Sequence, residues 1–187
     1  LDQRASEGDS RAQFELGQKL LKEGQTDAAK GWLEKALNQG VKEAREPLVG
    51  LIVQSAKEAF GKFDNPKAIE IYNQAFVLEP DSFEVIYGLS RALDSRGQDL
   101  LSEEKRGADE DVIRASLKQA EKLKDKYPQK GETWVMMAIT TGNLAKFLGG
   151  KEKVKIGSKV EEYCKKAIET DPSQGMAYAV LATYYVA

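Results

Sequence analysis

The chain repeats a pattern of apolar and small residues at helical spacing, interrupted by proline. Between residues 68 and 93, such residues recur three and four positions apart on both sides of Pro80, a period that indicates two amphipathic helices. Proline removes a backbone donor and clashes with the preceding turn, so it marks the junction between them. Proline returns in the same setting at Pro128 and Pro172. The pattern predicts an all-α chain of successive helical hairpins.

Small residues indicate a further hairpin near the N-terminus. Gly8 and Gly40 lie 32 residues apart, and small residues at such an interval let neighbouring helices approach closely. Gly24 followed by Thr26 indicates the end of one helix and the start of the next. We therefore expect a helical hairpin over about 10–39.

The second hairpin is predicted over about 42–80, with a proline near its start. Pro47 falls inside a helix that the apolar spacing places from Lys42 onward. Because proline breaks a helix interior, we expect either a kink there or a start delayed to Glu46. Pro66 suits the first turn of the following helix, so it marks the start of the second arm.

The packing positions of these hairpins follow a known repeat. Counted so that the closing proline is position 32, the second hairpin has Ala68, Tyr72 and Ala75 at positions 20, 24 and 27. The chain therefore resembles the tetratricopeptide repeat (TPR) superfamily. The first hairpin resembles the related Sel1-like repeat, with Trp32 and Ala36 at packing positions. The resemblance implies an all-α, right-handed α-α superhelix (a TPR-like solenoid) of about nine helices, in four hairpins plus one terminal helix.

The resemblance covers nearly the whole chain and gives the later repeat boundaries. Repeats are expected over about 82–128 and 131–172, with a partial repeat over 175–187, so that residues 1–187 form a single solenoid domain. The residues that match the opening helix of these repeats are Ile86, Leu89, Ser90 and Leu93, then Trp134, Met137 and Ala138, then Tyr178, Leu181, Ala182 and Tyr185.

The later repeats are longer than the family period. Pro80 and Pro128 are 48 residues apart, and Pro128 and Pro172 are 44 apart. These spacings exceed the ~34-residue repeat by about 14 and 10 residues. Shared equally between both arms, the excess predicts unusually long hairpins; the alternative is a charged loop over 97–111.

The C-terminal segment over 147–187 resembles a narrower group. Its Gly-Lys-Glu-Lys turn at Gly150 to Lys153 and its Lys-Ala-Ile-Glu-x-Asp-Pro close are similar to regulator-of-microtubule-dynamics proteins and to bacterial lipoproteins associated with TRAP transporters. That resemblance implies a scaffold with an internal ligand cleft and a partner protein.

The TPR resemblance also assigns residues to a concave groove. In that family the groove is lined by fixed positions of each opening helix, which here are mostly apolar and include one arginine, so they favour an amphipathic peptide or a hydrophobic ligand, with Arg91 available for an acidic group. The alternative is that residues such as Ile139 and Val180 meet a further helix. The expected groove residues are Tyr87, Arg91, Asp94, Glu132, Met136, Ile139, Asn143, Val180 and Thr183.

Composition and charge limit the kinds of ligand and catalytic group that the chain can use. The chain has 28 basic and 30 acidic residues and no histidine, so it lacks a basic field for nucleic acid and the commonest metal ligand and general base. No apolar run reaches the ~20 residues that span a bilayer. We expect no metal, no cofactor and no nucleic acid partner. The chain begins with Leu1, so any targeting segment is expected to lie outside it, and localisation and oligomeric state are left open.

Two motifs with possible chemistry are better explained by packing and solvation. Cys164 occupies the packing position that Tyr72 holds earlier, so we expect a buried thiol rather than a nucleophile. The lysines at 151, 153, 155 and 159 are most simply a solvated face, with a partner surface as the alternative.

The sequence therefore predicts a binding module rather than an enzyme. The leading hypothesis is a non-catalytic protein-protein interaction scaffold that binds a peptide segment or partner protein in its concave groove. The alternative is a small-molecule-binding accessory component of a transport system, with an apolar cleft for a hydrophobic ligand.

Overall fold

The computed structural model describes residues 1–103 and 107–186 of the chain. Those residues form helices and connecting turns, with no strand among them. The α-helices are α1 (Asp2–Ser6), α2 (Ser10–Lys22), α3 (Thr26–Asn38), α4 (Arg45–Gly61), α5 (Asn65–Leu78), α6 (Phe83–Ser102), α7 (Ala108–Lys126), α8 (Gly131–Leu144), α9 (Gly150–Thr170) and α10 (Gly175–Val186), with short 3-10 segments η1 (Lys42–Ala44) and η2 (Ala145–Phe147).

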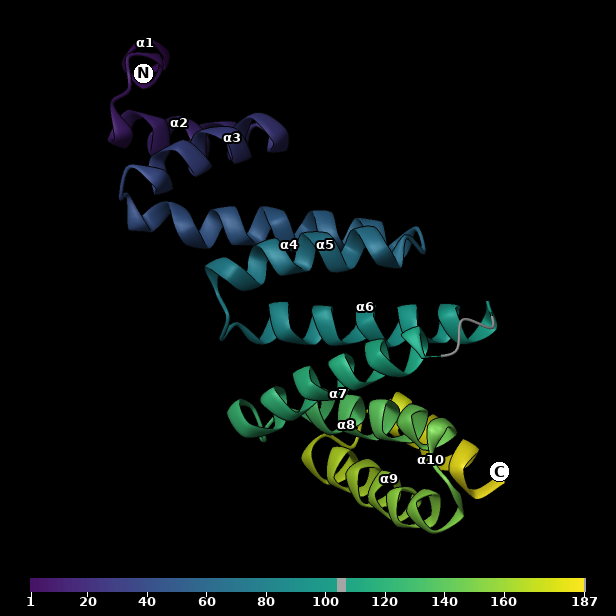
Figure 1. The fold of residues 1–187 in the computed structure, drawn as a ribbon. Helices are drawn as coiled ribbons and strands as arrows, with labels where there is room; N and C mark the ends of the chain where they lie inside the picture. The colour runs from purple at the N-terminus through teal and green to yellow at the C-terminus, as the bar shows by residue number, and fades with distance from the viewer. Residues whose placement is uncertain (104–106, 187) are drawn as a thin grey trace.

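The helices stack in chain order from one end of the molecule to the other (Figure 1). The predicted hairpins correspond to α2–α3, α4–α5, α6–α7 and α8–α9, followed by α10. Each hairpin packs on the next one, as α5 does on α6 and α7 on α8. The all-α solenoid is confirmed, and the short helix α1 is an addition that the sequence pattern did not predict.

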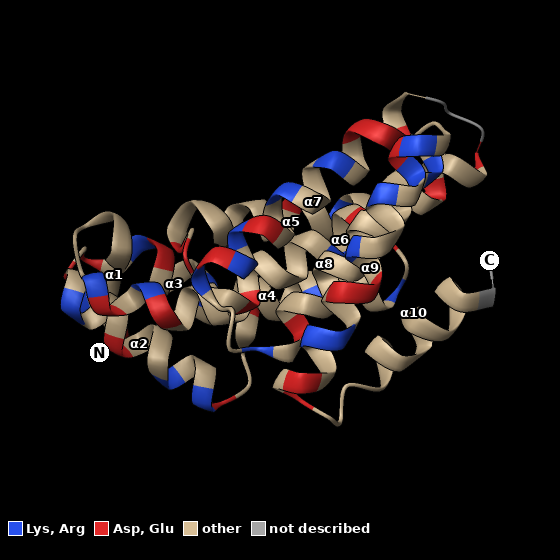
Figure 2. Ribbon diagram, turned by 90° about the horizontal axis from the view of Figure 1, so that it is seen from below, with Lys and Arg blue, Asp and Glu red and all other residues tan. Residues whose placement is uncertain are grey.

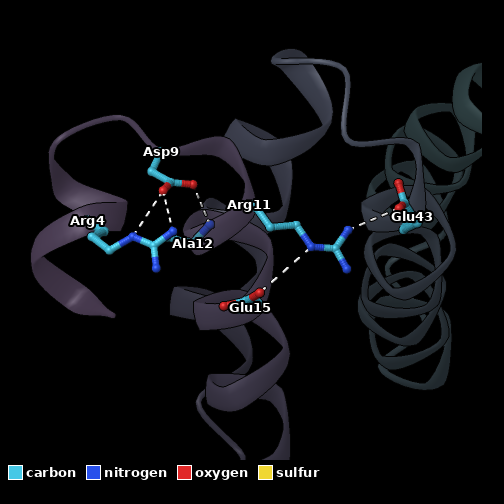
Figure 3. A network of polar contacts seen from close by, with 6 residues as sticks. All are labelled: Arg4, Asp9, Arg11, Ala12, Glu15 and Glu43. Carbon is cyan, nitrogen blue, oxygen red and sulfur yellow. Dashed lines mark hydrogen bonds and ion pairs between the residues drawn. The ribbon is translucent and has the colours of Figure 1, made fainter.

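A network of polar contacts attaches α1 to α2 and α2 to η1 (Figure 3). Arg4 donates to Asp9 at 2.6 Å, and the other carboxylate oxygen of Asp9 accepts from the backbone of Ala12 at 2.9 Å, which caps α2. Arg11 reaches Glu43 at 3.0 Å. A cap of this kind contributes about 1 kcal/mol, whereas exposed ion pairs contribute little.

The start of α4 resolves the two alternatives for Pro47. Residues Lys42–Ala44 form a 3-10 turn and α4 begins at Arg45, so the helix start is delayed to within one residue of the predicted Glu46. Pro47 is then the third residue of the helix, where the backbone donor has no partner within the helix. The proline therefore costs no helical hydrogen bond.

Small residues hold the two arms of the third hairpin close together. Ser90 on α6 donates to the backbone oxygen of Ser116 on α7 at 3.1 Å, and Ser116 donates back to the backbone oxygen of Ser90 at 2.8 Å. Both side chains are buried. Since each hydroxyl has a partner, the close approach leaves no buried polar group unsatisfied at this crossing.

The extra residues of the two long repeats are placed differently. In the third hairpin α6 has 20 residues and α7 has 19, so both arms are extended and most of 97–111 is helical; residues 104–106 lie outside the described residues. In the fourth hairpin α8 has 14 residues and α9 has 21. Equal lengthening holds for the third hairpin and is wrong for the fourth, because the chain leaves the α-helix at Ala145 and turns at Gly149 before α9 begins.

Candidate functional site

The opening helices of successive repeats lie side by side, α4 against α6, α6 against α8 and α8 against α10. All nine predicted groove residues belong to α6, α8 and α10. We call the exposed side of α4, α6 and α8 the groove face.

Arg91 is an exposed cation on α6, and two aromatic rings hold it. Its guanidinium carbon lies 4.9 Å from the ring centre of Phe60 on α4 and 5.6 Å from that of Tyr87 on its own helix. Stacking of this kind contributes about 0.5–1 kcal/mol at an exposed site. Within the described part of the chain, no carboxylate lies within ion-pair distance of Arg91. The guanidinium is therefore oriented but free to receive an anion.

The aromatic surface continues from Tyr87 toward the start of α6. The ring of Tyr87 stacks on Phe83 with centres 5.5 Å apart, and Phe83 meets Tyr127 edge-on at 5.3 Å. The ammonium nitrogen of Lys130 also lies over the Phe83 ring, 4.5 Å from its centre. Burial raises the pKa of Tyr87, so its hydroxyl is neutral at physiological pH. The groove face thus offers an apolar strip beside a cation.

A second pair of predicted residues meets one helical turn beyond Arg91. The side-chain amide of Asn143 on α8 donates to both carboxylate oxygens of Asp94 on α6, at 3.0 and 3.1 Å. Burial raises the pKa of Asp94, while the Asn143 hydrogen bond and the charge of Lys146 act to lower it. Asp94 and Asn143 therefore link α6 to α8 and form a polar floor.

The other predicted residues have different environments. Met136 is 2% exposed and packs in the core, so it supports the groove face from beneath. Ile139 and Val180 are half-buried against the C-terminal helices. Glu132 is half-buried and its charge acts to raise the pKa of Tyr87. Thr183 is exposed and donates to its own helix backbone.

Sequence reasoning missed Phe60 and Phe83, which complete the aromatic surface around Tyr87 and Arg91. Phe60 follows the apolar spacing of α4. That spacing predicts a helix, but it does not distinguish residues of the buried core from residues of the groove face. The pairing of Lys57 with Glu84, a hydrogen bond between α4 and α6, was likewise not predicted.

The other side chains that could act as a nucleophile or bind a metal ion are not arranged to do so among the described residues. Cys164 is fully buried, and burial raises the pKa of its thiol to about 11, so the thiolate is not populated near neutral pH. Among the described residues, no group of three or more acidic or cysteine side chains is positioned to hold a metal ion. None of the described helices combines the length and apolarity needed to cross a bilayer.

Solved structures with a similar fold are TPR proteins. MamA, residues 41 to the end, from Desulfovibrio magneticus RS-1 aligns over 95% of this chain and 84% of its own, with 15% identity and a TM-score of 0.57. YrrB, described as a TPR protein with an unusual peptide-binding site, aligns over 94% of this chain and 76% of its own, with 16% identity and a TM-score of 0.53. At these identities the likeness shows the fold. The comparison with curated proteins found no match.

The family comparison agrees with the resemblance of the C-terminal segment and extends it. The model of the family described as regulator of microtubule dynamics protein 1-3 matches residues 52–186. This match begins in α4 and runs through α10, so it includes the groove face from α4 to α8. The chain belongs to the regulator of microtubule dynamics protein 1-3 family.

Proposed function

We propose that this protein is a non-catalytic interaction scaffold whose groove face binds a peptide segment of a partner protein. Its TPR-like fold supports a role in protein interaction, and the peptide-binding site described for YrrB shows that this fold can carry one. The observation that carries the proposal is Arg91, which is exposed, oriented by two rings and without an ion-pair partner among the described residues.

The contacts around Arg91 indicate the chemistry of the bound segment. A carboxylate of the peptide would pair with the guanidinium, whose planar fork suits bidentate recognition. The adjoining rings of Phe60, Tyr87 and Phe83 favour an apolar or aromatic side chain next to that carboxylate. Asp94 lies one turn farther along α6, paired with Asn143 of α8, and this pair offers hydrogen-bonding groups for the peptide backbone.

The test is a peptide selection followed by affinity measurement. Peptides selected on the parent protein from a random library should carry Asp or Glu beside an apolar residue, and their affinity is measured by fluorescence polarisation. Arg91→Ala should weaken binding about tenfold or more. The affinity of Arg91→Lys should lie between those of the parent and Arg91→Ala, because lysine keeps the charge but lacks the planar stacking group.

Arg45→Ala provides the matched control. Arg45 is another exposed arginine without an ion pair within the structure described, and as the first residue of α4 it lies about 22 Å along the helix from Phe60, away from Arg91. Its substitution should leave the affinity unchanged. Selected peptides with no acidic residue, or equal affinities of parent and Arg91→Ala, would contradict the assignment of the groove face.

A further inference from the structure

The unequal arms of the fourth hairpin leave a cleft on another part of the molecule. Helix α8 ends at Leu144, whereas α9 starts at Gly150 and runs for 21 residues. A cleft of about 430 Å³ lies between α7, the end of α8 and the first half of α9. It contains none of the predicted groove residues. The residues that line it are Arg114, Leu144, Leu148, Glu152, Lys155, Ile156 and Lys159.

The rim of this cleft carries an excess of positive charge, since its lining includes Arg114, Lys155 and Lys159 against one carboxylate, Glu152. Lys155 and Lys159 are exposed and lie one helical turn apart on α9, a spacing at which like charges repel. Neither lysine forms an ion pair with any of the described carboxylates. Arg114 adds a third positive charge from α7, already held by Glu110 at 2.6 Å.

The second half of α9 shows that the pattern is local. There Lys165 pairs with Glu161 at 2.7 Å and Lys166 with Glu162 at 2.8 Å, each across one turn. In the first half, Lys151 continues the row of Lys155 and Lys159 at the same spacing, and Glu152 is the one acidic residue between Lys151 and Lys159. The row spans about 12 Å at 1.5 Å per residue. Figure 2 shows basic and acidic segments together at the end of the molecule that carries the α6–α7 connection.

Beneath the rim the cleft is apolar. Leu144 is 5% exposed, and Leu148 and Ile156 are half-buried. A ligand that matches both the basic rim and the apolar floor carries several negative charges along an extended backbone. It also carries at least one aliphatic side chain that reaches the floor. A single small anion is too short to meet a row of about 12 Å.

We propose that this cleft is a second binding site, which takes an acidic peptide segment with an aliphatic anchor. Charge complementarity places the acidic residues along Lys151, Lys155 and Lys159, and the aliphatic residue between Leu148 and Ile156. The site is independent of the proposed groove face, since the two share no residue.

The test uses a labelled ten-residue peptide of repeating Glu-Glu-Leu composition, with fluorescence polarisation as the readout. The double variant Lys155→Glu, Lys159→Glu should weaken binding about tenfold or more. The double variant Lys22→Glu, Lys67→Glu makes the same change in net charge at two exposed lysines outside the cleft, and should bind almost as well as the parent. Circular dichroism confirms that each variant is folded.

Two further peptides separate charge from the apolar floor. A peptide with Gln in place of Glu should bind at least about tenfold more weakly, and so should one with Gly in place of Leu. Because the proposed groove face also favours an acidic residue beside an apolar one, all of these measurements are made in the Arg91→Ala background, where the Glu-Glu-Leu peptide should still bind to the cleft.

Several results would overturn the proposal. These are no binding of the Glu-Glu-Leu peptide by the Arg91→Ala protein, equal loss in both double variants made in that background, or equal affinity for the Gly peptide. Binding of inorganic phosphate, or of phosphatidylcholine vesicles containing phosphatidylserine, that depends on Lys155 and Lys159 while the peptide fails to bind would assign the cleft to another ligand class.

Discussion

At the residue scale, one helix end uses a bulky residue in a backbone conformation that suits glycine. Phe63 follows α4 with φ of 60°, whereas Gly8, Gly24 and Gly40 hold the corresponding positions after α1, α2 and α3 with φ of 100°, 76° and 89°. The next residue closes the turn in each case, as Asp64 does by donating to the backbone oxygen of Ala59 at 3.0 Å. Phe63 is 87% exposed, so its ring gains little from packing.

Phe63→Gly should therefore stabilise the protein. A left-handed conformation costs a non-glycine residue about 1–2 kcal/mol, part of which is offset by the greater freedom of glycine in the unfolded chain. We expect a net gain of about 1 kcal/mol, which raises the thermal midpoint by roughly 2–4 °C in a chain of this size. Phe63→Ala removes the ring and keeps the strain, so it should match the parent. Equal midpoints for the Gly and Ala variants would refute the explanation.

Asp94 makes a prediction about pH. Since burial raises its pKa, the folded state favours the neutral acid relative to the unfolded chain, where aspartate titrates near ~3.9. The resulting stability is fully present below the unfolded pKa and is lost as pH rises through the folded pKa. Asp94→Asn keeps an oxygen that accepts from Asn143 and removes the charge.

This substitution should raise the free energy of unfolding at pH ~7 by about 1 kcal/mol, the order of most single-residue effects. The gain should disappear in acid, below the unfolded pKa, where Asp94 is protonated in both states. Urea unfolding of the parent and Asp94→Asn, at pH ~7 and in acid below the unfolded pKa, measures this gain in the free energy of unfolding. Asp125→Asn, at an exposed site on α7, is the control and should change stability equally little at each pH. A gain that persists in acid would exclude ionisation as its cause.

At the element scale, the packing of one repeat on the next depends on how closely helices approach. Gly88 on α6 faces the buried ring of Tyr72 on α5, and a Cβ atom added to Gly88 would lie 2.2 Å from that ring. Such a distance requires the ring or the helix to move. The contact lies directly behind the groove face, because Gly88 follows Tyr87 on the same helix.

Gly88→Ala should destabilise the protein by about 1–3 kcal/mol, the usual cost of overpacking a core, despite the better helix propensity of alanine. Gly50→Ala is the matched control: Gly50 is also inside a helix, and an added Cβ meets nothing within 4 Å, so a gain of up to about 1 kcal/mol is expected. The two variants should shift the urea midpoint in opposite directions. Adding Tyr72→Leu to Gly88→Ala should recover part of the loss, and no recovery would argue against the steric cause.

At the scale of the whole molecule, the apolar core is distributed along the stack. One large cluster joins residues from α2 to α6, and smaller clusters follow toward α10. In a solenoid each repeat contacts its neighbours alone, so the energetic effect of a substitution stays local. The proposed groove face and cleft can be tested with separate substitutions, since Arg91 does not line the cleft and Lys155 does.

Much of this architecture was predictable because helix ends and helix periods are local properties. Pro80, Pro128 and Gly24 mark helix ends through their own backbone constraints, and the spacing of Ala68 and Tyr72 marks a packing face. The site was less predictable. Tyr87 and Arg91 do lie together, but their partner Phe60 comes from another repeat, and helical spacing alone did not separate it from core residues.

What the sequence determined by itself is the succession of helical hairpins, since proline, glycine and apolar period act within a few residues of where they stand. The tertiary structure alone decided which residues are accessible and which meet. It buried Met136 beneath the groove face, paired Asp94 with Asn143, and gave the extra length of the fourth repeat to α9, which opened the cleft. These outcomes depend on contacts between helices far apart in the chain, and the burial that fixes them exists only once the repeats have stacked.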